Sequence, residues 1–526
     1  RAAAAEIEGE SARRGKGQAL LAAAPAQKHL EAMSLEGLCA LTGACARLRA
    51  LGGPDGADGA ALAAALGRVQ RSGFRLAPAH LGHLLHSFGR WHQACRQAMD
   101  AATESLVSDL FRSTLRPAVL RTAPAFARPQ HVAFAAAGLA GAGCRGREEL
   151  LPLEALAALL LGAQVGGPAQ PLHWDRFCGR DLAVLAEAFG EAAAAGPGAD
   201  PSTDGGGPVA DLLESMASHL LGPAAGTAGD AGSVGDANVG RLGALEASAA
   251  CRLAGAFCWA PRGVEICQAA AARVLEEPVG GLASASLARL LRAMGRLQLR
   301  QGALCGGLLW LLHQRLWGVW GAARAELDEG AAGADELLIQ RLRGELDVPL
   351  AAAALVAAER LGCFDAAATQ EEARPVLQGL LWGALALARG EAARAGERAP
   401  GRHLQMASVL RCVALAAAEV PLGPEWQRSV AEHLEFAVAV LEERGALPLR
   451  AQEWCGLSRA LCRLAVAHRG GECEAPLRRA AARLSLHGPA EVDGGSFGGS
   501  EAALALAGLA EAGFDARAAA PTVARA

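Results

Sequence analysis

Three histidines at three-residue spacing form the group of side chains best suited to hold a metal. His80, His83 and His86 give the pattern H-x-x-H-x-x-H, and His92 and Cys95 follow closely. On a helix the three rings spread over about a third of the circumference, so at most two share an ion without help from elsewhere. We therefore predict no metal site. We expect instead a polar helix face that packs on a neighbour or touches RNA phosphates.

The glycine motifs of nucleotide-binding proteins are incomplete in this sequence. A P-loop requires G-x-x-x-x-G-K-[ST], but the segment around Lys16 has Glu10 in place of the first glycine and Gly17 in place of the hydroxyl. The glycines of 138–143 miss the dinucleotide-binding spacing, and no strand is expected before them. These segments predict a tightly packed helix and turn rather than a cofactor site.

Catalytic arrangements are not recognisable either. No nucleophile occupies a strand-to-helix elbow, and no pair of carboxylates stands out. Lysine occurs only at positions 16 and 28, which nearly closes Schiff-base and lysine-base chemistry. We expect a protein that is not an enzyme, with no catalytic residue, no cofactor and no small-molecule substrate. An enzyme is the least favoured alternative.

Arginine supplies nearly all of the positive charge. The formal net charge of -4 and the pI near 6.4 do not fit a free nucleic-acid-binding domain, which is normally basic. Local basic faces remain possible, because the planar guanidinium suits phosphate and carboxylate alike. The candidates for RNA contact are Arg341, Arg343, Arg478, Arg479 and Arg483. A solvated helix surface, and codon bias in a GC-rich genome, are the alternative explanations.

The hydrophobic pattern predicts a helical hairpin between residues 403 and 441. One apolar stripe consists of Met406, Val409, Leu410, Val413 and Ala417, and a second consists of Val430, Leu434, Ala437 and Leu441. Pro421, Gly423 and Pro424 separate them and end the first helix. Neither helix can bury its stripe alone, so the two must pack together.

Similar lead segments recur along the chain, which indicates a repeat architecture. They begin near positions 81, 131, 182, 247, 286, 406, 454 and 501, at spacings of about 40 to 65 residues. Small residues within them would let neighbouring helices approach closely. We therefore predict an all-α protein, an irregular α-solenoid of stacked helical hairpins.

Composition divides the chain into four segments. We expect a flexible N-terminal extension at 1–33, N-terminal helical repeats at 34–195, Gly-rich loops around one short helix at 196–243, and C-terminal helical repeats at 244–526. The chain begins with an arginine, and its Ala-rich start is open to interpretation as the remnant of an organellar presequence. Three glutamates before position 11 depart from the acid-poor pattern of such peptides.

The fourteen cysteines are scattered through apolar helical runs and include no C-x-x-C. Cys251 with Cys258, and Cys455 with Cys462, lie two helical turns apart, too far along the axis for a disulfide within one helix. We expect reduced, buried thiols that behave as small apolar side chains.

The most hydrophobic segment is 304–320, LCGGLLWLLHQRLWGVW. His313, Gln314 and Arg315 lie at its centre, where a charge in a bilayer costs about 3 kcal/mol or more, so we predict no membrane span. The alternatives are a core helix and a protein interface, and the interface candidates are Trp310, Trp317 and Trp320.

The segment 406–434 resembles the octotricopeptide (OPR) repeats of algal organellar proteins, which are similar to the FAST-kinase-like and RAP-family helical repeats. In that family the first helix is followed by a P-P-P-E-W turn and a second helix. Here Pro424, Glu425 and Trp426 keep the last three residues of this signature. Proline and glutamate suit the first turn of a helix. Only this unit carries the signature; 171–174, PLHW, is a faint echo.

The resemblance implies an organellar protein of gene expression, mitochondrial or alternatively chloroplast. Its expected partners are organellar RNA, rRNA above all, and ribosomal or other complex proteins. Of the roles implied, a mitochondrial ribosome subunit fits the acidic balance better than a free RNA-processing or stability factor. A protein-only scaffold of armadillo or HEAT type, in a respiratory or other multi-subunit complex, is the second hypothesis.

Overall fold

The structure is a computed structural model and describes residues 30–50, 57–72, 75–95, 109, 111–143, 147–165, 170–195, 207–222, 241–260, 262–278, 281–325, 341–342, 345–369, 371, 373–394, 402–420, 424–443 and 451–487. Every regular element in these ranges is helical, as the hydrophobic pattern predicts. The chain divides into two compact units, 1–270 and 271–526. The sequence-based boundary at 196–243 falls inside the first unit.

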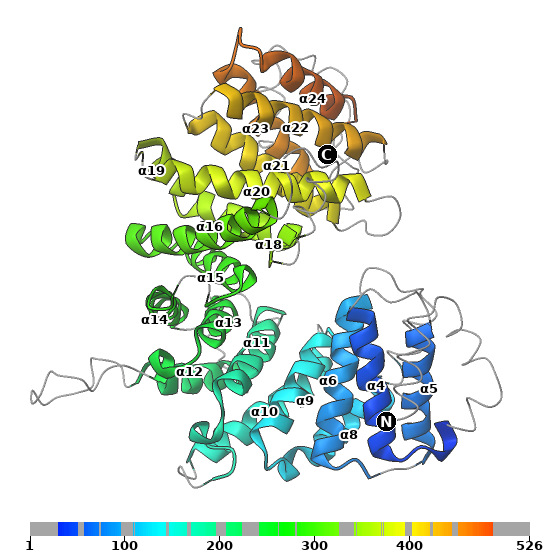
Figure 1. Cartoon of the computed structure of the whole chain (residues 1–526). Helices are drawn as coiled ribbons and strands as arrows, with labels where there is room; N and C mark the ends of the chain where they lie inside the picture. Colours follow the sequence, from blue (N-terminus) through cyan, green and yellow to red (C-terminus); the bar gives the residue numbers. More distant parts are fainter. Residues whose placement is uncertain are drawn as a thin grey trace, which may run out of the picture. The chain divides into compact units, whose positions relative to one another are not determined.

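In the first unit the helices form two layers of stacked hairpins (Figure 1). The lead helices pack side by side in chain order: α4 (Leu35–Ala50), α6 (Pro78–Cys95), α9 (Pro129–Gly141), α11 (Gly179–Ala195) and α13 (Ala247–Phe257). The second helices pack back on them: α5 (Ala57–Ser72), α8 (Arg116–Thr122), α10 (Arg147–Val165) and α12 (Pro208–Leu221). Helix α12 is the short helix expected among the Gly-rich loops, and it packs on α10 and α11.

The second unit repeats this arrangement. Its lead helices are α15 (Ser284–Arg296), α18 (Val348–Arg360), α21 (Arg402–Glu419) and α23 (Ala451–Ala467), each packed on the next. Its second helices are α16 (Gly302–Ala325), α20 (Ala373–Arg394), α22 (Pro424–Glu443) and α24 (Glu474–His487). They also pack in order and on their own lead helices. Within each unit, therefore, the chain is an α-solenoid of helical hairpins.

Short elements connect the hairpins. They are a π-helix η1 (Phe111–Leu115), the 3-10 helices η2 (Ala123–Ala125), η3 (Trp174–Arg176) and η4 (Arg241–Ala244), and the short helix α19 (Cys363–Thr369). Helix α14 (Gly263–Leu275) includes the point of division between the units. Prolines open α6, α9, α12 and α22, where the missing amide donor has no partner to lose.

The hairpin predicted at 403–441 is confirmed as α21 and α22. The stripe residues of both helices are at most 3% exposed, including Met406 at 3% and Leu434 at 0%. Burying each leucine or valine contributes about 1.5–3 kcal/mol. Helix α4 likewise buries an apolar side, which includes Leu38 and Leu41. The apolar stripes thus supply the two-layered core.

Small residues bring neighbouring lead helices into backbone contact, as predicted. A Cβ atom added to Gly138 of α9 would lie 2.2 Å from the backbone carbon of Leu85 in α6. One added to Gly190 of α11 would lie 2.5 Å from the carbonyl oxygen of Ala256 in α13. Because real Cβ atoms do not approach this closely, these crossings require glycine.

Helix α16 contains the most hydrophobic segment of the sequence. Cys305, Leu308, Leu312 and Leu316 form its buried side. Among the described helices, none combines the length and the apolar character that a bilayer crossing requires. Of the cysteines that the structure describes, nine are buried.

Candidate functional site

The histidines of the H-x-x-H-x-x-H pattern lie on α6 and contact different neighbours. His80 Nε2 lies 3.4 Å from Glu36 Oε1 on α4. The rings of His83 and His86 face Phe134 on α9, with centroid distances of 5.4 and 4.7 Å. No three potential metal ligands converge in the described part of the chain. His83 and His86 thus pack on a neighbouring helix, α9, which is one of the two roles expected of this helix face.

The two residues that follow this pattern lie near the end of α6. His92 is 9% exposed, its Nδ1 lies 3.2 Å from the carbonyl oxygen of Gly141, and its ring stacks on Phe88 with a centroid distance of 5.9 Å. The side chain of Cys95 lies outside the described residues. His92 thus joins the packing of α6 on α9.

Arginine–glutamate pairs join successive lead helices within each unit. In the first unit Arg252 of α13 donates hydrogen bonds to both carboxylate oxygens of Glu187 in α11, at 2.8 and 2.5 Å. In the second, Arg411 of α21 donates to both oxygens of Glu359 in α18, at 2.9 and 2.7 Å. Bidentate, charge-assisted bonds are stronger and more directional than neutral ones. These pairs therefore fix α13 on α11 and α21 on α18.

Three of the arginines predicted to contact RNA are paired with carboxylates. Arg479 and Arg483 of α24 reach to α22, and Arg478 reaches back one turn on its own helix. Their partners are Glu435 at 2.9 Å, Glu442 at 2.5 Å and Glu474 at 2.5 Å, respectively. A neighbouring carboxylate offsets the charge that would attract a phosphate.

Of the remaining two candidates for RNA contact, the structure describes one. Arg341 is half-buried, and Arg343 lies outside the described residues. RNA contact by any of the five arginines stays a prediction.

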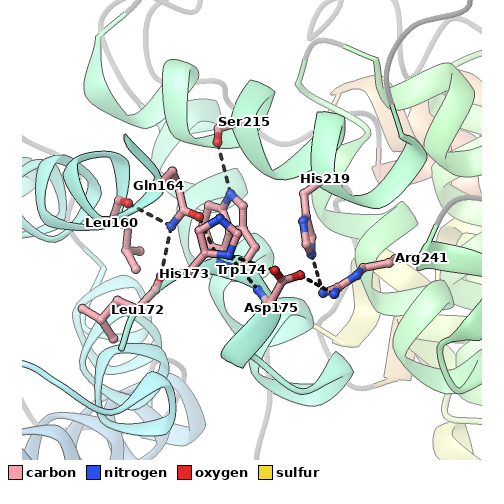
Figure 2. Close-up of polar contacts among 9 residues, drawn as sticks. All are labelled: Leu160, Gln164, Leu172, His173, Trp174, Asp175, Ser215, His219 and Arg241. Atoms are coloured by element: carbon pink, nitrogen blue, oxygen red, sulfur yellow. Dashed lines mark hydrogen bonds and ion pairs between the residues drawn. The ribbon is translucent and has the colours of Figure 1, made fainter. Parts of the chain in front are cut away.

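A polar network fixes the segment that connects α10 to α11 (Figure 2). Gln164 of α10 donates from Nε2 to the carbonyl oxygens of Leu160 and Leu172, both at 3.0 Å. Its Oε1 accepts a hydrogen bond from the backbone amide of Trp174 at 3.0 Å. Trp174 is 3% exposed, and its Nε1 donates to Ser215 Oγ of α12 at 3.1 Å. The network thus attaches the connecting segment to two helices.

Ionisable side chains lie beside Trp174, on the side of η4 (Figure 2). Arg241 forms an ion pair with Asp175, and its Nη1 lies 3.0 Å from His219 Nε2. His173 Nδ1 lies 3.2 Å from Asp175 Oδ2. Burial, followed by the charge of Arg241, lowers the pKa of His219 to about 4. This imidazole is consequently neutral at pH 7 and a weak base, which suits a structural hydrogen bond better than proton transfer.

The turn signature lies where the sequence predicts, at the start of a second helix. Pro424, Glu425 and Trp426 are the first three residues of α22, and Trp426 is half-buried. The echo at 171–174 lies instead between successive hairpins, before α11. The fully buried tryptophan of this part of the chain is Trp454 in α23, whose Nε1 donates to the carbonyl oxygen of Leu484 at 3.0 Å.

Two of the three tryptophans predicted for a core or an interface, Trp310 and Trp317, lie on the outer side of α16. Trp310 is 45% exposed and Trp317 is 53% exposed, and the His313 ring stacks on Trp317 with a centroid distance of 5.8 Å. The core alternative is therefore wrong for these two residues, because the i, i+7 spacing places both opposite the leucine stripe. The side chain of Trp320 lies outside the described residues.

Two pockets in the second unit are too small for a substrate. One lies beneath α16 and is lined by leucines such as Leu309, Leu312 and Leu355, and the other is lined by Val274, Leu287 and Arg315 among others. Each has a cavity volume of about 10 Å³. That is space for about one water molecule.

Sequence reasoning missed the residues that tie the repeats together, including Gln164 and the pair Arg411 and Glu359. One signal was available near the end of the second unit. Arg463 with Glu419, and Arg479 with Glu435, share a separation of 44 residues, close to the spacing between the lead segments at 406 and 454. Opposite charges at a recurring separation therefore mark neighbouring turns of the solenoid.

Comparison with known proteins adds no family. No family model and no curated protein matches the chain. One similar solved structure is described as "Circular tandem repeat protein with novel repeat topology and enhanced subunit contact surfaces". The likeness covers 87% of this chain and 95% of that chain, at 15% identity and a TM-score of 0.22. A TM-score this low carries no argument about fold or function.

Proposed function

We propose that the protein is a non-enzymatic helical-repeat scaffold that holds partner macromolecules along its stacked hairpins. The observation that carries this proposal is the use of its charged side chains. Arg252 and Glu187, and Arg411 with Glu359, join repeat to repeat instead of facing a cavity. Repeat architectures of this kind present extended surfaces that suit macromolecular partners.

The assembly that we propose contains RNA, and a mitochondrial ribosome subunit is the specific form of the proposal. Charge distribution supports the RNA component. Residues 59–147 contain eleven arginines and three acidic residues, in a chain with a formal net charge of -4. Such a basic segment supplies the phosphate attraction that the chain as a whole does not. Localisation in a mitochondrion or a chloroplast belongs to the same proposal.

A protein-only scaffold is the second candidate. The observation that favours it is the outer side of α16, where Trp310 and Trp317 are about half exposed. Tryptophan is enriched at the energetic centres of protein interfaces. A multi-subunit complex without RNA would use this surface and leave the basic segment in solvent.

Ultraviolet crosslinking in intact organelles tests the RNA component directly. After digestion, mass spectrometry identifies peptides that carry nucleotide adducts. We expect adducts within residues 59–147. Crosslinks from both units to other proteins, without any nucleotide adduct, would favour the protein-only scaffold instead.

A further inference from the structure

The face that α6 and α9 share carries positive and titratable groups without acidic ones. Helix α6 contains four histidines and one arginine, helix α9 contains one histidine, and neither contains an aspartate or glutamate. His83 and Arg90 are exposed on α6, and His86 is half-buried. His131 and Phe134 of α9 are half-buried. We name these five residues the histidine face.

Ring contacts hold the histidine face together across the two helices. The His83 ring lies 6.3 Å from the His131 ring and 5.4 Å from the Phe134 ring, measured between centroids. His86 stacks on Phe134 with an interplanar angle of 14°. Partly exposed aromatic rings of this kind are the platforms on which proteins stack nucleic-acid bases.

Neighbouring elements place two arginines and two glutamates around the histidine face, and both glutamates are engaged with other side chains. Arg128 precedes α9 and Arg180 lies on α11, close enough to act on His131 and His86, respectively. On α4, Glu36 is engaged with His80. Glu187 of α11 is engaged with Arg252.

These surroundings disfavour protonation of the histidines in the isolated protein. Burial, followed by the charges of Arg90, His83 and Arg180, lowers the pKa of His86 to about 4. Burial, followed by His83 and Arg128, lowers the pKa of His131. His86 Nδ1 is buried and has no hydrogen-bond partner among the described residues. The face therefore holds a ring nitrogen that can take up a proton without breaking a contact.

We propose that the histidine face binds single-stranded RNA and takes up protons as it does so, so that affinity rises as the pH falls. Phosphates lie against Arg90, Arg128 and Arg180, and bases stack on the exposed parts of His83 and Phe134. The inference rests on the proposed RNA-containing assembly and adds to it the place of contact and its pH dependence.

The coupling follows from electrostatics. A phosphate placed among the arginines offsets the charges that keep His86 and His131 neutral. Their pKa values are then higher in the complex than in the free protein, so binding takes up protons. The affected range extends upward from about pH 4, where free His86 titrates, through the ordinary histidine value near 6.5. Each proton taken up changes affinity by up to about tenfold per pH unit.

The test measures binding of the full chain to a fluorescein-labelled poly(U) oligonucleotide by anisotropy, at constant ionic strength, at about pH 5.5 and about pH 7.5. We expect affinity to be at least about threefold higher at the lower pH. The double variant His86→Gln, His131→Gln should lose this gain, so that its affinities at the two pH values lie closer together than those of the parent. Arg90→Gln should weaken binding at both pH values, and in a separate salt titration it should reduce the salt dependence by about one counterion.

A matched control is His433→Gln, which changes a histidine on α22 and should leave both the affinity and its pH dependence unchanged. Circular dichroism verifies that every variant is folded at both pH values. RNA binding that is insensitive to pH and to these substitutions would overturn the histidine face and leave the RNA-containing assembly standing. Failure of the parent chain to bind poly(U) would remove support from both. Equal competition by poly-glutamate would overturn the assignment to RNA.

Discussion

Arg411 of α21 lies between Glu359 of α18 and Gly456 of α23. Its guanidinium donates to both oxygens of Glu359, at 2.9 and 2.7 Å. A Cβ atom added to Gly456 would lie 2.7 Å from Arg411 Cδ. One side chain of α21 therefore contacts the lead helices of both the preceding and the following repeat.

The Arg411 and Glu359 pair should couple α21 to α18 in a measurable way. Glu359→Ala leaves a half-buried guanidinium without its carboxylate, so we expect a loss of about 1–3 kcal/mol in the free energy of unfolding. Urea denaturation of Arg411→Ala, Glu359→Ala and the double variant gives the interaction energy. Strictly additive losses would show that the pair contributes no coupling.

Gly138 should be intolerant of even one additional carbon atom. Gly138→Ala places a Cβ 2.2 Å from the backbone of Leu85, so α6 and α9 must separate, at a cost of about 1–3 kcal/mol or more. The matched control is Gly162→Ala on α10, where a Cβ meets no described atom within 4 Å. That change should stabilise the protein by about 0.5–1 kcal/mol, because alanine is the better helix former. Equal melting shifts for both variants would contradict the close crossing.

The tryptophans should differ in their contribution to stability according to burial. Trp454→Ala removes a ring that is 0% exposed and should cost about 3–5 kcal/mol. Trp310→Ala, on the outer side of α16, should change stability by about 0.5 kcal/mol or less. Half-buried Trp426 should fall between the two. Thermal denaturation ranks the three variants, and a large loss for Trp310→Ala would indicate that its ring is covered.

Thiol reactivity should also follow burial. Burial raises the pKa values of Cys267, Cys363 and Cys412 to about 12, and Cys178 is exposed. Because the thiolate is the reacting species, iodoacetamide at about pH 8 should label Cys178 well before these three. Mass spectrometry of the native protein measures the order, and labelling in urea supplies the control. Early labelling of Cys412 would contradict the placement of α21.

Acid should destabilise the first unit through His219. Its pKa is about 4 in the folded state and about 6.5 when unfolded, so the unfolded chain binds more protons in this range. The stabilising contribution of neutral His219 is thus complete above about pH 6.5 and is lost as the pH falls towards 4. His219→Gln keeps an acceptor for Arg241 but cannot titrate. Urea denaturation at about pH 7.5 and pH 5 should show a smaller acid loss for the variant than for the parent, and an equal loss would exclude His219 as a cause.

The hairpins were predictable because their determinants are local. In α21 and α22 the apolar stripe, Pro424 and the spacing of Val430 and Leu434 are all visible within one segment of sequence. Helix α18 was missed as a lead helix because alanine occupies six of its 13 positions and gives little periodic contrast. It does have the cap Asp347, whose Oδ1 accepts from the Leu350 amide at 2.9 Å.

The candidate sites were less predictable because they depend on which helices stack. The partner of Arg411 lies 52 residues away, and nothing near either residue identifies it. The exposure of Trp310 likewise depends on which side of α16 faces the leucines of its neighbours. The histidine pattern was visible, but its assembly with His131 and Phe134 required the crossing of α6 over α9.

Sedimentation of the native protein from organelle extract, with and without RNase, tests the central claim most directly. Mass spectrometry of the fractions identifies the proteins that migrate with it. The account predicts migration in a large particle with ribosomal or other RNA-binding proteins, and collapse of that particle on RNase treatment. Migration in a complex that RNase leaves intact would contradict the RNA-containing assembly and establish a protein-only scaffold in its place.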